Sequence, residues 1–334
     1  MKILVTGGAG FIGSNFIHYL IDNYDDEIIN LDKLTYAGNL ENLKDVEDNP
    51  NYTFIKGDIS DSKIVNEIVS DGVDYIVNFA AESHVDRSIE EPEIFINTNV
   101  LGAQVLLNAA KEHGIEKFVQ VSTDEVYGSL GETGYFTEET SLAPNSPYSA
   151  SKTSADLMVR AYRETFGLST NITRCSNNYG PYQFPEKLIP LFTSNAMEGK
   201  ELPLYGDGKN VRDWLHVKDH CRAIDLVMRK GKDGEIYNIG GNNEKTNIEI
   251  TEAILNVLDK PKSLIKFVKD RPGHDKRYAI DSSKIQEELG WEPEYTFEEG
   301  IKETIDWYVN HQDWWKKIKS GEYKDYYEKM YGDK

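Results

Sequence analysis

The sequence predicts an α/β protein: a doubly wound parallel sheet with a smaller, mixed α/β lobe beside it. Two observations predict this fold. Short apolar runs alternate with segments of helical periodicity through the first half of the chain, and a glycine-rich turn follows the first run. Such alternation gives parallel strands covered by helices on both faces, with ligands bound beyond the carboxyl ends of the strands.

The apolar runs place the elements in order. Strands are expected at residues 2–6, 27–31, 52–56, 74–79, 117–122 and 169–174, and helices at 11–23, 61–70, 93–113 and 146–167. From about residue 177 prolines and glycines become frequent and the alternation ends. We therefore expect one domain over 1–176, and a second lobe with a C-terminal helix over 177–334. Part of the later chain, about 212–230, should pack back on the first domain.

The turn from Thr6 to Gly13 is typical of a dinucleotide site. Its glycines let a pyrophosphate approach the backbone N–H groups at a helix N-terminus. Asp32 ends the next apolar run about 20 residues on, where a carboxylate accepts a hydrogen bond from the adenosine ribose. The charge of Asp32 disfavours the extra phosphate of NADP, although Lys33 weakens that argument slightly. The pattern predicts a Rossmann domain that binds NAD.

Tyr148 and Lys152 are spaced i, i+4, which places both side chains on one helix face. A nearby ammonium lowers the pKa of a phenol, so such a tyrosine can act as a base near neutral pH. The strand before this helix ends in Ser122 and Thr123. A hydroxyl followed by a tyrosine–lysine helix in one Rossmann chain resembles the short-chain dehydrogenases/reductases.

Asp124 and Glu125 follow Thr123 directly. In an acidic protein such a pair is usually a solvated loop, but its place at a strand end favours a catalytic role. Two neighbouring carboxyls repel, so one can stay protonated while the other ionises. One acid and one base are what the elimination of water requires.

Around these residues the chain resembles the dTDP-glucose 4,6-dehydratases, from residue 2 to about residue 310. The segments that carry the likeness are 30–39, 80–89, 122–128, 174–183, 186–190 and 271–275. The Asp–Glu pair is the discriminating element. Nucleotide-sugar epimerases share the glycine turn and the tyrosine–lysine helix but lack the two carboxyls, and sugar-nucleotide decarboxylases have Thr-Ser-Glu in place of Thr-Asp-Glu.

The resemblance implies an NAD-dependent hydro-lyase that converts dTDP-glucose to dTDP-4-keto-6-deoxyglucose for deoxysugar synthesis, such as the rhamnose route. Tyr148, helped by Thr123 and Lys152, would remove the 4-OH proton while hydride leaves C4 for NAD. Glu125 would take the C5 proton, Asp124 would protonate the departing 6-OH, and hydride would return to C6.

The resemblance and the strand ends together give two sets of binding residues. The expected cofactor contacts are Gly7, Gly10, Phe11, Ile12, Gly13, Asp32, Lys33, Thr35, Asp58, Ile59, Ala80, Ala81, Ser83, Thr98, Ser122, Tyr148, Lys152 and Asn178. The expected substrate contacts are Ser83, Thr123, Asn177, Glu186, Lys187, Leu188, Pro203, Tyr205, Arg212, Asn247, Arg271 and His274. No metal site is predicted. Asp58 and Ile59 either flank the adenine or cap the following helix.

Composition limits the partners. The formal net charge of −20 argues against nucleic acid and anionic membranes. Cys175 and Cys221 have no CxxC neighbour, so neither a disulfide framework nor a zinc site is expected. No signal peptide fits, because the first strand begins at Lys2, and no apolar stretch approaches membrane-spanning length. We therefore expect a cytoplasmic protein.

Residues 97–110 and 148–166 each carry an apolar face, which either packs against the sheet or meets a second subunit. In the family, equivalent helices of two subunits form a four-helix bundle, so the resemblance implies a homodimer. Two alternatives to the main function stay open. The same scaffold acts on UDP- or CDP-glucose as a dehydratase or inverts C4 as an epimerase, or the chain is a nucleotide-sensing binding protein without turnover.

Overall fold

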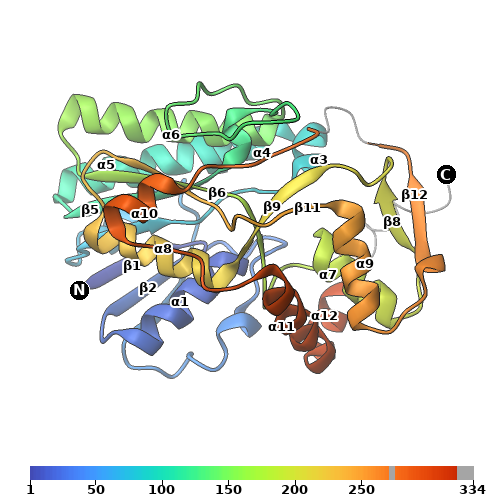
Figure 1. The fold of residues 1–334 in the computed structure, drawn as a ribbon. Helices are drawn as coiled ribbons and strands as arrows, with labels where there is room; N and C mark the ends of the chain where they lie inside the picture. Colours follow the sequence, from blue (N-terminus) through green and yellow to red (C-terminus); the bar gives the residue numbers. More distant parts are fainter. Residues whose placement is uncertain (271–274, 322–334) are drawn as a thin grey trace.

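The computed structural model describes residues 1–270 and 275–321, and a seven-stranded sheet with the order β10-β6-β5-β4-β1-β2-β3 forms its centre (Figure 1). All neighbouring strands of this sheet pair in parallel. The strands are β1 (Lys2–Thr6), β2 (Glu27–Asp32), β3 (Tyr52–Lys56), β4 (Tyr75–Asn78), β5 (Lys117–Thr123), β6 (Thr170–Cys175) and β10 (Ile236–Ile239). The expected doubly wound parallel sheet is confirmed, and its first six strands lie within a residue or two of their expected ranges.

Helices cover both faces of the sheet (Figure 1). One face packs on α1 (Phe11–Asn23) and α8 (Val217–Lys230) through a core that includes Phe16 and Val227. The other face packs on α2 (Ser62–Val69), α5 (Ala103–His113) and α6 (Pro147–Phe166) through a second core. Each sheet face is thus buried by its own layer of helices.

The expected helix over 93–113 is broken into three parts. After the short α3 (Val85–Glu90), the chain forms α4 (Pro92–Phe95), a π-helical segment η2 (Ile96–Gly102) and then α5. Pro92 begins this run at the first helical position, where its missing N–H costs no hydrogen bond. Apart from this break, the long helices of the first domain begin and end close to the predicted residues.

The second lobe is built around a separate hydrophobic core. Its strands form a mixed three-stranded sheet, in the order β11-β9-β7, and a parallel pair of β8 and β12. These strands are β7 (Asn177–Tyr179), β8 (Leu202–Tyr205), β9 (Val211–His216), β11 (Glu244–Thr246) and β12 (Ile265–Val268). The helices are α7 (Leu188–Met197), α9 (Asn247–Val257), α11 (Phe297–Asn310) and α12 (Gln312–Lys319). A short 3₁₀ turn, η4 (Lys262–Leu264), precedes β12, and another, η1 (Leu40–Leu43), lies between β2 and β3 of the large sheet.

The later chain gives the first domain more than the expected segment. Of the expected segment 212–230, α8 packs on the large sheet, whereas residues 212–216 belong to β9 in the small sheet. Strand β10 and α10 (Ser283–Leu289) also pack on the first domain. Strand β10 pairs with β6 and closes one edge of the sheet. The division at residue 176 therefore differs from the structure. After α8 the chain adds the four-residue strand β10 to the large sheet and then enters the second lobe again at β11.

The C-terminal region was expected to hold a docked helix. The structure shows α11 and α12, and Trp315 of α12 is buried, whereas residues 322–334 lie outside the described part. No helix within residues 1–270 or 275–321 has both the length and the apolar composition needed to cross a bilayer.

Candidate active site

The glycine turn between β1 and α1 leaves no room for side chains. A Cβ added to Gly7, whose φ is +69°, would lie 2.7 Å from the backbone of Ala80 at the end of β4. A Cβ on Gly13 would lie 2.4 Å from the carbonyl oxygen of Gly7. The turn therefore brings bare backbone to the N-terminus of α1, which is what a pyrophosphate requires.

Asp32 lies at the end of β2, beside this turn. Its carboxylate accepts hydrogen bonds from the backbone N–H groups of Ala9 at 2.9 Å and Leu34 at 2.8 Å. Burial raises the pKa of Asp32, while the two N–H groups oppose the rise. A carboxylate has room for further donors after two such bonds, so Asp32 can also accept from ribose hydroxyls. The glycine turn and Asp32 together fit NAD.

The carboxyl ends of β1, β2, β4 and β5 open into one cavity. Every residue that the sequence marks as a cofactor contact lines this cavity. Asp58 lines it too, and its carboxylate accepts from the N–H of Ser60, whereas the cap of helix α2 is Asp61. The cavity is also lined by residues that were not predicted as contacts, among them Gly38, Gln183 and Phe184. Gly38 and Gln183 lie in segments 30–39 and 174–183, which carry the family resemblance, so that resemblance was a signal that could have found them.

A second cavity adjoins the first and extends into the other lobe. Five residues line both: Ser83, Glu125, Asn177, Glu186 and Lys187. The expected substrate contacts that line the second cavity are Ser83, Asn177, Glu186, Lys187, Leu188, Pro203, Tyr205, Arg212 and Asn247, while Thr123 lines the first. Arg271 and His274 lie outside the described residues.

Helix α6 positions Tyr148 and Lys152 at the first cavity. The helix begins with Pro147 in its first turn and a capping box between Ser146 and Ser149, so its start is fixed tightly. Both Tyr148 and Lys152 are buried, and Lys152 Nζ donates to the carbonyl oxygen of Val121 on β5 at 2.7 Å. This bond ties the lysine to the strand that carries Thr123.

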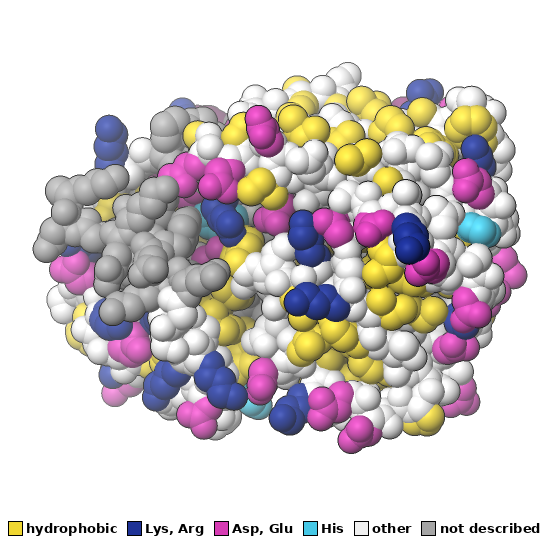
Figure 2. Space-filling model, turned by 180° about the vertical axis from the view of Figure 1, so that it is seen from behind, with side chains coloured by type: hydrophobic (Ala, Val, Ile, Leu, Met, Phe, Trp, Pro, Cys, Tyr) yellow, Lys and Arg dark blue, Asp and Glu magenta, His cyan; other side chains and the backbone are white. Residues whose placement is uncertain are grey.

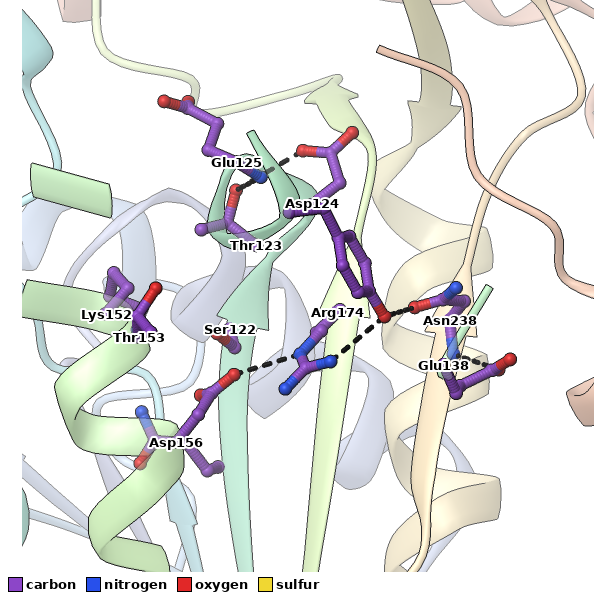
Figure 3. Close-up of polar contacts among 12 residues, drawn as sticks. Ser122, Thr123, Asp124, Glu125, Glu138, Lys152, Thr153, Asp156, Arg174 and Asn238 are labelled. Atoms are coloured by element: carbon purple, nitrogen blue, oxygen red, sulfur yellow. Dashed lines mark hydrogen bonds and ion pairs between the residues drawn. The ribbon is translucent and has the colours of Figure 1, made fainter. Parts of the chain in front are cut away.

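Asp124 and Glu125 lie on the 3₁₀ turn η3 (Asp124–Tyr127), directly after β5 (Figure 3). Thr123 caps the turn: its Oγ1 accepts from the N–H of Glu125 at 3.2 Å and donates to Asp124 Oδ1 at 3.4 Å. Figure 3 shows both carboxylates rising from the turn and diverging at their ends. The threonine hydroxyl and the two carboxyls therefore share one short piece of backbone at the mouth of the sheet.

The environments of the two carboxyls differ. Asp124 is only 2% exposed, whereas Glu125 is partly exposed to the cleft. Burial and the neighbouring charge of Glu125 raise the pKa of Asp124 well above its usual range, and Arg212 opposes the rise. A buried carboxyl of this kind stays protonated near neutral pH and can act as an acid.

The pKa of Tyr148 is raised in this structure, not lowered as the sequence predicts. Burial raises the pKa of Tyr148 well above its usual range, the charge of Glu125 adds to the rise, and a hydrogen bond from Thr123 opposes it. Burial also lowers the pKa of Lys152, and Asp156 opposes that change. The reason for the error is that desolvation of the phenolate outweighs the attraction of an ammonium one helical turn away.

Two cations reach the second cavity despite the acidic surface. Arg212 is 5% exposed, its Nη2 donates to the carbonyl oxygen of Asp275 at 2.9 Å, and its guanidinium lies 4.4 Å from the ring centre of Tyr278. Lys187 Nζ donates to the carbonyl oxygen of Ser83 at 3.2 Å. Both are suited to an anionic group such as a diphosphate.

A family model described as GDP-mannose 4,6 dehydratase matches residues 4–304. A dTDP-glucose 4,6-dehydratase of Xanthomonas campestris pv. campestris is 54% identical over 340 residues, which cover 96% of this chain and 97% of the relative. The chain belongs to the dTDP-glucose 4,6-dehydratase family. This agrees with the Asp–Glu pair that the sequence marks as the discriminating feature.

Solved structures of the family share the fold. The dTDP-glucose 4,6-dehydratase of Bacillus anthracis in complex with NAD is 58% identical, with a TM-score of 0.90, and the match covers 95% of this chain and 99% of that one. DesIV of Streptomyces venezuelae, a dTDP-glucose 4,6-dehydratase with NAD and TYD bound, is 52% identical, with a TM-score of 0.93 and coverage of 95% and 100%. NAD is thus bound in close relatives, in agreement with the cofactor predicted from the glycine turn and Asp32.

Proposed function

We propose that this chain is a dTDP-glucose 4,6-dehydratase, a hydro-lyase that converts dTDP-glucose to dTDP-4-keto-6-deoxyglucose and water. One observation carries the proposal: the buried Asp124 and the partly exposed Glu125 line the same cavity as Thr123, Tyr148 and Lys152. Hydride transfer and the loss of water need these two sets of groups at one substrate.

Bound NAD would accept a hydride from C4 and return it to C6; the glycine turn and Asp32 are the groups that would hold it. Tyr148 takes the proton of the 4-OH group, with Thr123 hydrogen-bonded to its oxygen. Tyr148 can accept this proton only as its phenolate, a form that burial disfavours, so the positive charges of Lys152 and of bound NAD would have to stabilise it. Lys152 supplies the nearby positive charge that such a transfer needs.

Elimination follows at the two carboxyls. The ketone at C4 acidifies the proton at C5, and Glu125 removes it. Asp124 holds a proton near neutral pH because burial and Glu125 raise its pKa, and it delivers that proton to the departing 6-OH group, which leaves as water. Elimination leaves Asp124 charged and Glu125 protonated. As the hydride returns to C6, C5 must gain a proton, and Glu125 delivers it after exchange with solvent. Asp124 regains a proton and Tyr148 loses one by exchange with solvent, which completes the cycle.

For the substrate, we propose that Lys187 and Arg212 bind the diphosphate; the other two expected contacts, Arg271 and His274, lie outside the described residues. The guanidinium of Arg212 can contact two phosphate oxygens at once, and its burial makes each contact stronger than at the surface. The sugar then lies toward Glu125 and Asn177, which line both cavities. The base lies among Leu188, Pro203, Tyr205 and Asn247 in the second lobe.

We also propose a homodimer through a four-helix bundle. The face formed by α4, η2 and α6 exposes Ile94, Ile96, Leu101, Leu157 and Phe166, each at least 40% exposed. Figure 2 shows hydrophobic side chains gathered in the upper part of the molecule, where α5 and α6 lie. An apolar face of this kind is typical of a subunit interface.

We further propose a cytoplasmic location. Cys175 and Cys221 are both free and buried, which suits a reducing compartment.

The test of the function is a side-by-side assay of dTDP-, UDP- and CDP-glucose with the purified protein. The 4-keto-6-deoxy product absorbs near-UV light in strong alkali, whereas an epimerised hexose does not. We expect this absorbance with dTDP-glucose in preference to the other two. Epimerisation of dTDP-glucose, preference for another nucleotide, or binding of the sugar without turnover would each overturn the proposal.

A further inference from the structure

Behind Lys152 lies a buried ion pair for which the proposed mechanism has no use. Asp156 follows Lys152 by one turn of α6, and Arg174 lies opposite on β6 (Figure 3). Arg174 Nε donates to Asp156 Oδ2 at 3.0 Å, and the two side chains are 3% and 1% exposed. Burying two charges is costly even when they are paired, which makes this pair a candidate for a specific role.

Arg174 is also fixed from its other side. Its Nη1 donates to the hydroxyl of Tyr127 at 3.0 Å, and that hydroxyl donates to Asn238 Oδ1 on β10 at 2.7 Å. The guanidinium lies 4.9 Å from the ring centre of Tyr127. Tyr127 ends η3, the turn that carries Asp124. Arg174 is therefore held between Asp156 on α6 and Tyr127 on η3, and Asn238 on β10 fixes the Tyr127 hydroxyl in turn.

Of the groups around Lys152, Asp156 is the one whose charge favours the protonated form of the lysine. Lys152 donates to a neutral carbonyl, that of Val121, while burial lowers its pKa and Asp156 opposes the change. The Cys175 thiol also lies near Lys152, but burial raises its pKa to about 12, so it is uncharged at neutral pH. Arg174 adds a second positive charge on the far side of Asp156.

We propose that Asp156, clamped by Arg174, is a positioning residue for the reaction: its carboxylate keeps the Lys152 side chain charged at the dry base of the cleft. Asp156 acts through Lys152 and touches neither substrate nor cofactor in this role. The inference rests on the proposed function, because it concerns the lysine that serves Tyr148. The remaining ionisable groups of the site, Asp124 and Glu125 on η3, act on Tyr148 rather than on Lys152.

The test is the pH dependence of kcat/KM for Asp156→Asn with dTDP-glucose. Asparagine keeps the size of the side chain and can still accept from Arg174, but it removes the negative charge. The charged form of Lys152 then loses its support, so its pKa falls. The alkaline limb of the profile, where Lys152 loses its proton, should move to lower pH by about one to three units, while the acid limb stays in place. Near pH 8, kcat/KM should fall about tenfold or more.

Three further variants separate this role from a structural one. Asp156→Glu retains the charge and should restore the wild-type limb. The double variant Asp156→Asn with Arg174→Gln leaves no unpaired charge, so it should fold but keep the displaced limb. Asp233→Asn is the matched control. Asp233 pairs at 3.1 Å with Arg163, which is on α6 like Asp156, but this pair lies at the surface. The pH profile of Asp233→Asn should be that of the wild type.

The outcomes are distinct. If Asp156→Asn loses activity but keeps both limbs, or if the double variant regains the wild-type profile, Asp156 serves only to neutralise Arg174 and the inference fails. If Asp156→Asn does not fold, as judged by circular dichroism, the double variant carries the same test. If the wild-type protein itself does not convert dTDP-glucose, the proposed function fails instead.

Discussion

Glu186 allows a prediction whose size follows from the structure, because its carboxyl is buried where the two cavities meet. Burial raises the pKa of Glu186 from its ordinary value of 4.5 to about 7, and Lys187 opposes the rise. Tyr36 donates a hydrogen bond to its Oε1 at 3.0 Å. The folded chain therefore holds this proton more tightly than the unfolded chain does.

The sign of the effect follows from that difference. A carboxyl whose pKa is higher in the folded state contributes its full stability below pH 4.5 and loses it as the pH rises through about 7. At about 1.4 kcal/mol per pKa unit, ionised Glu186 costs about 3 kcal/mol of unfolding free energy near pH 8. Glutamine has nearly the same shape, can accept from Tyr36 and has no proton to lose. Glu186→Gln should thus be more stable than the wild type by about 3 kcal/mol near pH 8, and by about 1 kcal/mol near pH 5.

The assay is urea unfolding followed by far-UV circular dichroism at both pH values, without NAD or nucleotide sugar, since bound ligands stabilise the fold by mass action. Glu47→Gln, at an exposed glutamate, is the matched control. The difference in unfolding free energy between this variant and the wild type should be the same at both pH values. Parallel stability curves for Glu186→Gln and the wild type across this range would refute the reasoning.

Three other predictions follow from the site and its surface. Asp124→Asn and Glu125→Gln should each lower turnover by about 10² to 10⁴-fold and stall after oxidation at C4; near-wild-type product formation in the alkali assay would remove their roles. Gly13→Ala places a Cβ 2.4 Å from the Gly7 carbonyl oxygen and should abolish NAD binding measured by calorimetry. An unchanged affinity would contradict the role of the glycine turn in binding the pyrophosphate. Leu157→Glu should shift the protein to monomer in analytical ultracentrifugation, whereas Phe267→Glu, at a similarly exposed residue of β12, should not; a dimer that survives Leu157→Glu rules out the α6 face.

The sequence predicts the first domain closely because its signals are local. Each of the first six strands is an apolar run followed by a turn or helix signal, and the glycine turn fixes the position of α1. Strand β10 has no such signal: Ile236–Ile239 is a four-residue run whose pairing with β6 depends on tertiary packing. The π-helical η2 between α4 and α5 is likewise invisible to helical periodicity.

The site shows the same division between local and tertiary information. Motifs single out Thr123, Asp124 and Tyr148 along the chain, and the fold brings all three to one cavity. Their electrostatics depend on burial, which spacing does not reveal, and so the expected direction of the Tyr148 pKa is wrong. Asp156 repeats the i, i+4 spacing after Lys152, a signal that could have been noticed; its pairing with Arg174 needs the fold.

The most direct test of the central claim follows the hydrogen at C4. If one cavity both oxidises C4 and expels the 6-OH group, dTDP-glucose labelled with deuterium at C4 should give a product with that label in the C6 methyl group and a solvent-derived hydrogen at C5. Mass spectrometry and NMR of the product measure both positions. Recovery of the deuterium at C4, or its loss to solvent, would contradict the account.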